Sequence, residues 1–127
     1  MAFSYQINQD SQIITVVWEG AFTLDEVNSS LDGMYNDGEY QATFSGIADV
    51  RKADFQLTPA ELKINHDFVK NHKKCPKGPW AVICDEPYQT ALALLYEKQY
   101  KTPHPVDVFT TFEAAQAWLS SVKNESR

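Results

Sequence analysis

Residues 79–84, PWAVIC, form a continuous apolar run with the length of one β-strand. A strand that is apolar on both sides is typical of a parallel sheet whose two faces are covered by other elements. In such sheets the strands alternate with helices along the chain. This run therefore predicts an α/β protein, with helical segments before and after it.

The segments on either side of this run fit that expectation. Residues 3–8 alternate apolar and polar side chains, residues 12–19 are rich in β-branched and aromatic ones, and the short polar break between them predicts a β-hairpin. Further strands are predicted at 43–50, with Gly46 where another backbone comes close, and at 105–109. The expected order is β-β-α-β-α-β-α-β-α. We therefore predict an α/β fold with a mostly parallel five-stranded sheet and an antiparallel edge strand.

Four segments carry apolar residues at helical spacing. The first is expected to begin with a capping box of Thr23 and Glu26, the second with the N-cap Thr58, and the last with a second capping box of Thr110 and Glu113. Gly38 is expected to end the first helix. The expected ranges are 23–37, 59–72, 85–100 and a last helix after residue 110.

The composition narrows the classes of function. A chain of 127 residues is predicted to form a single domain, 1–127, which needs neither a disulfide nor a metal to fold. Its net charge of −6 argues against a nucleic-acid partner. The sequence has no apolar run of membrane-spanning length, its start does not resemble a secretory signal, and Cys75 and Cys84 fit a reducing compartment. We therefore expect a cytoplasmic protein.

A basic segment interrupts this acidic chain. Between Arg51 and Lys77 there are seven basic and three acidic residues, whereas the remainder has four basic and fourteen acidic ones. Such a segment is either a solvated, lysine-rich helix end or a contact site for an anionic partner, such as lipid headgroups at the inner face of a membrane. The residues predicted to make that peripheral contact are Lys63, Lys70, Lys73, Lys74 and Lys77.

The predicted helix 59–72 carries two apolar rows. Leu62 and Val69 lie on one side of a helical wheel, and Ala60, Ile64 and Phe68 lie nearly opposite. A helix that covers a sheet needs one apolar face, so the second row needs a partner. That partner is a neighbouring helix or loop, a second copy of the chain in a homodimer, or an apolar ligand beneath the helix.

The last option predicts a binding site for an apolar small molecule or lipid, with the helix 59–72 as a mobile lid. Aromatic and aliphatic side chains at the hinge end of the helix and along its second row would contact the ligand. They are Phe55, Leu57, Ala60, Ile64 and Phe68.

The sequence shows no pattern of catalytic or metal-binding chemistry. His66 and His72 are six residues apart, which does not place them on one helix face as metal ligands, and His104 lies in a Pro-His-Pro turn. All three are interpreted as surface histidines. Cys75 lies among lysines that would favour its thiolate, but no base accompanies it. No dinucleotide, phosphate-loop or nucleophile-elbow motif is present. We therefore expect no metal, no cofactor and no enzymatic activity.

The element order, the stretch DVRKADF (49–55) after the third strand and the ending VFTTFEAAQAWL (108–119) resemble the SpoIIAA-like branch of the STAS superfamily. This branch is also similar to CRAL-TRIO lipid carriers, in which a mobile helix opens an apolar cavity. The resemblance covers nearly the whole chain and implies the fold together with a binding or protein-interaction role. The matching residues of the ending are Val106, Phe109, Glu113, Ala115, Trp118 and Leu119.

The resemblance also raises the question of a phosphorylation switch. STAS anti-sigma-factor antagonists bind a partner kinase and are switched off by phosphorylation of a serine in a D-S-S-G-type loop before the second helix. The matching stretch here, 55–59, lacks that motif, and Pro59 stands near the place of the serine. Thr58 is the only hydroxyl in the stretch, and we interpret it as a structural N-cap.

Overall fold

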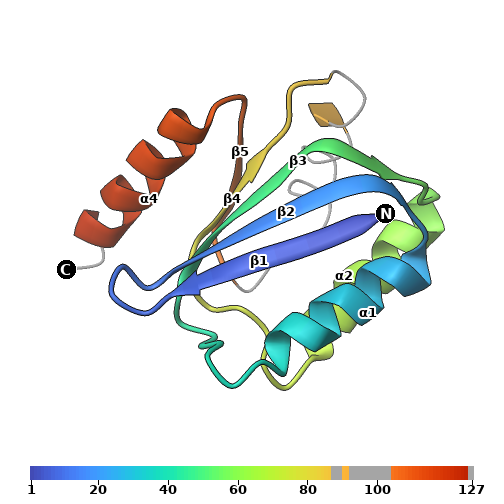
Figure 1. Cartoon of the computed structure of the whole chain (residues 1–127), viewed down its shortest axis with the longest axis horizontal. Coiled ribbons are helices and arrows are strands. Elements are labelled where there is room, and N and C mark those ends of the chain that lie inside the picture. Colours follow the sequence, from blue (N-terminus) through green and yellow to red (C-terminus); the bar gives the residue numbers. More distant parts are fainter. Residues whose placement is uncertain (87–89, 92–103, 126–127) are drawn as a thin grey trace.

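The protein forms one five-stranded sheet with helices on both of its faces (Figure 1). The computed structural model describes residues 1–86, 90–91 and 104–125. The elements in these ranges are β1 (Ala2–Asn8), β2 (Ile13–Phe22), α1 (Leu24–Tyr35), β3 (Ser45–Phe55), α2 (Pro59–Asn71), β4 (Trp80–Ile83), β5 (Val106–Phe109) and α4 (Phe112–Glu125).

The strands lie in the order β1-β2-β3-β4-β5, which is also their order along the chain. The edge strand β1 is antiparallel to β2, and the remaining pairs are parallel. The predicted α/β class, the mostly parallel sheet and the antiparallel edge strand are therefore confirmed. The helix predicted at 85–100 falls largely on residues outside the described ranges.

The two faces of the sheet carry different helices. Helices α1 and α2 lie side by side on one face, and α4 lies on the other (Figure 1). Side chains alternate between the two faces along each strand. On β4, for example, Trp80 belongs to the core beneath α1, whereas Ala81 and Ile83 pack with Ala115 and Leu119 of α4.

Strand β3 extends five residues beyond the predicted strand 43–50. It ends at Phe55, so the stretch DVRKADF belongs to the strand and does not follow it. The charged residues of this stretch concealed its pairing with β2, which continues to Phe22 opposite Phe55 after a register shift. The Phe55 ring packs against the rings of Trp18 and Phe22, with centroids 5.4 and 5.7 Å away. The longer strand carries Phe55 to the start of α2.

The ends of α1 follow their caps. The N–H of Glu26 donates to Thr23 Oγ1 at 3.4 Å and the N–H of Thr23 donates to Glu26 Oε1 at 2.9 Å, which confirms the predicted capping box. The helix ends earlier than predicted, because Asn36 is its C-cap and Gly38 lies beyond it.

The cap of α4 differs from the prediction by one position. The N–H of Ala114 donates to Thr111 Oγ1 at 3.2 Å, and the helix begins at Phe112. The predicted capping box of Thr110 and Glu113 is therefore wrong, because it places the N-cap one residue too early. Within the described ranges, no helix has the length and apolar character needed to cross a membrane.

Candidate ligand-binding cavity

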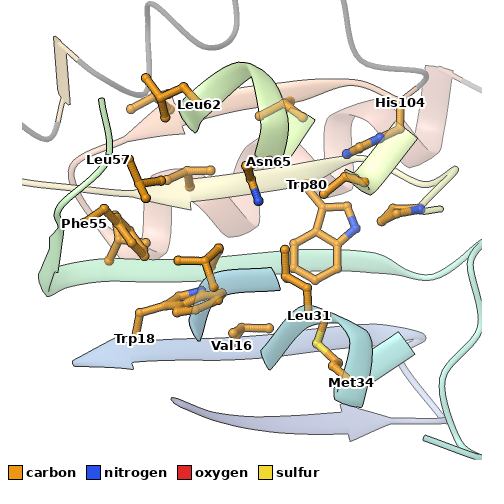
Figure 2. A pocket seen from close by; sticks show the side chains of 18 of the residues that line it. Val16, Trp18, Leu31, Met34, Phe55, Leu57, Leu62, Asn65, Trp80 and His104 are labelled. Carbon is orange, nitrogen blue, oxygen red and sulfur yellow. The ribbon is translucent and has the colours of Figure 1, made fainter. Parts of the chain in front are cut away.

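An apolar cavity of about 270 Å³ lies between the sheet and the helices α1 and α2 (Figure 2). Its floor includes Val16, Ala48 and Val82, which are neighbours across β2, β3 and β4. The small side chain of Ala48 thus lies between two valines in the middle of the floor. Leu31 and Met34 of α1 close the cavity from the other side (Figure 2).

The strand end before α2 forms one end of the cavity. Phe55 and Leu57, which the sequence predicted as ligand contacts, both line it there (Figure 2). Trp18 lies beside Phe55 and lines the cavity as well. Two of the five predicted contact residues are therefore placed where a guest would meet them, and their contact with a ligand stays a prediction.

Helix α2 faces the cavity with Leu62, Asn65 and Val69. Leu62 is buried, and Asn65 Nδ2 donates to Asn28 Oδ1 of α1 at 2.9 Å. This hydrogen bond holds the middle of α2 against α1. The row of Leu62 and Val69 is thus the row that lies over the cavity.

The second apolar row of α2 does not line this cavity. Ala60 is exposed, and Ile64 is 52% exposed. Phe68 is half-buried beside His72, with ring centroids 5.7 Å apart. A helix turns by about 100° per residue, so a row opposite Leu62 must point away from the sheet. The predicted ligand contacts of Ala60, Ile64 and Phe68 are therefore not supported by where these residues lie.

Trp80 forms the opposite end of the cavity from Phe55 (Figure 2). Its indole lies over Gly46, its neighbour on β3, and a Cβ at residue 46 would lie 2.3 Å from the ring. The sequence predicted a close backbone at Gly46, whereas the close group is this side chain. Trp80 is 9% exposed, and Nε1 has no hydrogen-bond partner within the described part of the chain.

His104 lies near Trp80 and also lines the cavity (Figure 2). It is 8% exposed, so its interpretation as a surface residue is wrong. Burial lowers the pKa of His104 to about 4, and the imidazole is therefore neutral at pH 7. His66 is also buried, at 7% exposed, so its interpretation as a surface residue is wrong as well. Their positions in polar stretches of sequence gave no sign of this burial.

The C-terminal end of α2 is fixed to α1 through His72. Its Nδ1 accepts from the N–H of Lys74 at 3.0 Å, so in the neutral ring Nε2 carries the proton and donates it to Asp32 Oδ1 at 2.9 Å. The same ring packs on Tyr35, with centroids 4.9 Å apart. The hydroxyl of Tyr40, a residue that follows α1 in the chain, donates to the carbonyl of Lys74 at 2.8 Å, and Lys74 lies just beyond the end of α2. Two hydrogen bonds and one ring contact therefore hold this end of α2 against α1 and the residues that follow α1.

The N-terminal end of α2 has a local cap. The N–H of Glu61 donates to Thr58 Oγ1 at 3.2 Å, and the N–H of Thr58 donates to Glu61 Oε1 at 3.0 Å. This capping box confirms the structural role that the sequence assigned to Thr58. Its hydroxyl oxygen is used to satisfy a backbone N–H of the first turn.

The predicted basic surface is present as exposed side chains. Lys63 Nζ pairs with Asp67 Oδ2 at 3.0 Å on the outer side of α2. Cys75 lies half-buried in the same region, where burial raises the pKa of its thiol. The thiol is therefore less reactive than its lysine neighbours suggested. The exposed lysines are Lys63, Lys70, Lys73, Lys74 and Lys77.

Known structures share this architecture. An uncharacterised protein of the DUF3478 family from Shewanella loihica PV-4, described as having a SpoIIAA-like fold, matches with a TM-score of 0.64 and 18% identity over 93% of this chain and 92% of that chain. The anti-sigma factor antagonist SpoIIAA in its unphosphorylated form matches with a TM-score of 0.51 and 9% identity over 94% of this chain and 98% of that chain. The chain matches no known family model and no curated protein.

These comparisons define the class of fold. The chain has the SpoIIAA-like, STAS-type fold, as the sequence resemblance implied. At these identities the likeness concerns the backbone arrangement and leaves the function to be argued from the cavity and the surface.

Proposed function

We propose that the protein binds an apolar or lipid-like small molecule in the cavity beneath α2. The observation that carries this proposal is the cavity itself, about 270 Å³ of space lined largely by hydrocarbon side chains. Natural interiors are close-packed, and voids larger than a water molecule are few. Small-molecule sites are usually mostly apolar pockets of about 300–1,000 Å³, and this cavity lies close to the lower end of that range. A guest that fills the space would recover the contacts that its lining lacks.

Helix α2 would act as the lid. Its C-terminal end is fixed by His72, whereas its N-terminal turn holds its own cap and begins with the exposed residues Pro59 and Ala60. Movement of the N-terminal half away from the sheet would break the Asn65–Asn28 hydrogen bond and expose Leu62. We expect a guest to enter by this movement, with His72 as the hinge.

Native mass spectrometry after gentle purification tests the proposal. We expect a monomer that carries additional mass, which disappears under denaturing conditions. The freed molecule should partition into an organic solvent. A chain that shows no bound mass natively and takes up no hydrophobic probe when one is added would contradict a binding role for the cavity.

A second candidate is a protein-interaction or regulatory module, and it is favoured by the exposed side chain of Ile64. A large aliphatic residue that is 52% exposed on α2, next to exposed lysines, suits a dimer contact or a docking site for an acidic partner. Thr58 would not serve as a phosphorylation switch in this role, because its hydroxyl caps the helix. Ile64→Asp should then abolish assembly without unfolding the chain. A ligand-free dimer in the native spectrum would favour this candidate over the carrier.

The same lysines would allow peripheral contact with a membrane. Each lysine near an anionic bilayer contributes about 1 kcal/mol of attraction. Flotation with vesicles of anionic and of neutral phospholipid tests this contact. Binding to anionic vesicles that disappears in 0.5 M salt, which shortens the screening length, would support it. Equal recovery with both kinds of vesicle would contradict it.

A further inference from the structure

Asn65 is a polar side chain in the roof of a cavity that is lined largely by hydrocarbon. It lies on α2 between Leu62 and Val69, and all three residues line the cavity. Figure 2 shows its amide pointing from α2 into the cavity. Small-molecule sites combine an apolar lining with a few polar groups that orient the ligand. Asn65 is placed to be such a group.

The bond with Asn28 fixes this amide and uses only part of its hydrogen-bonding capacity. Asn65 Nδ2 donates to Asn28 Oδ1 at 2.9 Å, and the bond joins α2 to α1. A primary amide has two N–H donors and a carbonyl oxygen that accepts. The bond to Asn28 therefore leaves one N–H and the oxygen Oδ1 of Asn65 for a further partner.

The chemistry of the guest decides what happens to these two groups. A hydrocarbon in the cavity would displace water from the Asn65 amide and offer no hydrogen bond in return, which is unfavourable for a polar group. A hydroxyl group both donates and accepts. It can donate to Oδ1 or accept from the remaining N–H, so it suits this amide in either orientation of the guest.

The volume indicates the size of the apolar part of the guest. An engineered cavity of about 150 Å³ binds a single benzene molecule. The cavity here, at about 270 Å³, is less than twice as large. A bicyclic ring system is therefore a suitable size for a probe molecule.

We propose that the cavity selects apolar molecules that carry a hydroxyl group, and that the side chain of Asn65 binds this hydroxyl. This inference rests on the proposed ligand-binding function and names the class of ligand. It also assigns a binding role to a residue that was not among the ligand contacts predicted from the sequence.

Two probes of nearly equal shape test the inference. 2-Naphthol has a hydroxyl group where 2-methylnaphthalene has a methyl group, and both are uncharged at pH 7. We would measure both dissociation constants by equilibrium dialysis for the full chain and for Asn65→Leu, which keeps a similar side-chain volume without a polar atom. Comparing the ratio of the two constants between the proteins removes the difference in hydration of the probes. We expect Asn65→Leu to weaken 2-naphthol about five-fold more than 2-methylnaphthalene, a difference of about 1 kcal/mol.

Asn28→Ala is the matched control. It removes the same hydrogen bond between α1 and α2 and leaves the Asn65 amide at the cavity. The ratio for this variant should stay within about two-fold of the parent value. An equal shift in both variants would mean that the lost contact between the helices causes it, and the inference would be wrong. Urea unfolding checks that the variants fold, and Asn65→Ala takes the place of Asn65→Leu if the leucine is not accommodated.

The outcomes separate the inference from the function on which it rests. If both probes bind and the substitution at Asn65 leaves the ratio unchanged, the selectivity for a hydroxyl is wrong and the cavity remains a binding site. If neither probe binds to the parent protein, the proposed function fails and the inference fails with it.

Discussion

The indole of Trp80 on β4 lies against the backbone of Gly46 on β3, at a distance that leaves no room for a side chain at residue 46. Absence of a Cβ at this one position lets the large ring lie flat on the sheet and form an end of the cavity. A hydrogen atom at residue 46 thus determines where one of the two tryptophan side chains of the cavity lies.

Gly46→Ala should therefore change both stability and binding. The new methyl group would overlap the indole and force Trp80 to move, which we expect to lower the free energy of unfolding by about 2 kcal/mol. Urea unfolding followed by tryptophan fluorescence measures this change. The matched control is Gly33→Ala on α1, where a new Cβ meets nothing within 4 Å and should raise stability by about 0.5–1 kcal/mol. Equal effects at both glycines would contradict this account of Trp80.

Burial of His104 predicts a pH dependence of stability. Its pKa is lowered from the ordinary value of 6.5 to about 4, so between these values the unfolded chain binds more protons than the folded one. The free energy of unfolding should therefore fall as the pH drops from about 6.5 toward 4, by roughly 2–3 kcal/mol in total. Urea unfolding of the protein and of His104→Gln at pH 7, 5.5 and 4.5 measures it. The difference between the two proteins isolates this histidine, and a difference that does not vary with pH would show that His104 is accessible to protons when folded.

The two apolar rows of α2 should respond differently to truncation. Leu62→Ala removes a buried side chain over the cavity and should cost about 2–3 kcal/mol of unfolding free energy. Ile64→Ala, two residues away on the same helix, removes a side chain that is 52% exposed and should cost less than about 0.5 kcal/mol in the monomer. Both variants are compared by urea unfolding at low protein concentration. A larger loss at Ile64 than at Leu62 would mean that the helix presents its other row to the sheet.

The cap of α2 gives a further prediction. Thr58→Ala removes the acceptor for the N–H of Glu61 and should lower the unfolding free energy by about 1 kcal/mol. Thr58→Ser and Thr58→Asp keep a capping oxygen and should stay close to the parent protein. Thermal and urea unfolding of the three variants provide the comparison. A loss in Thr58→Asp as large as that in Thr58→Ala would speak against capping as the role of this threonine.

The sequence predicted the architecture because its signals are local. Strand alternation, helical spacing and the capping box at Thr23 each occupy a few neighbouring residues, and they agree with one another. The extension of β3 was missed because Arg51 and Lys52 mask a pairing that depends on β2. Within this segment Ala53 and Phe55 alternate with the exposed residues Lys52 and Asp54, which is the pattern of a strand with one buried face.

The sequence alone does not predict the shape and lining of the cavity, because these depend on residues that are far apart in the chain. Ala48 and Gly46 are small where the floor needs space, but their neighbours Val82 and Trp80 belong to another strand. The two rows of α2 are similarly apolar, so no local signal indicates which row faces inward. Phe55 and Leu57 line the cavity, as their position at the strand end that precedes α2 allows, and their contact with a ligand stays a prediction.

The central claim is that the space beneath α2 accepts an apolar guest, and filling that space tests it most directly. Ala48 lies in the middle of the floor, so Ala48→Phe should occupy the cavity with its own ring. We would titrate the protein and this variant with the neutral fluorescent probe N-phenyl-1-naphthylamine, after urea unfolding has shown that the variant is folded. The account predicts saturable one-to-one binding to the parent protein and at least a ten-fold loss in Ala48→Phe. Equal binding to both folded proteins would place the probe elsewhere and contradict the claim.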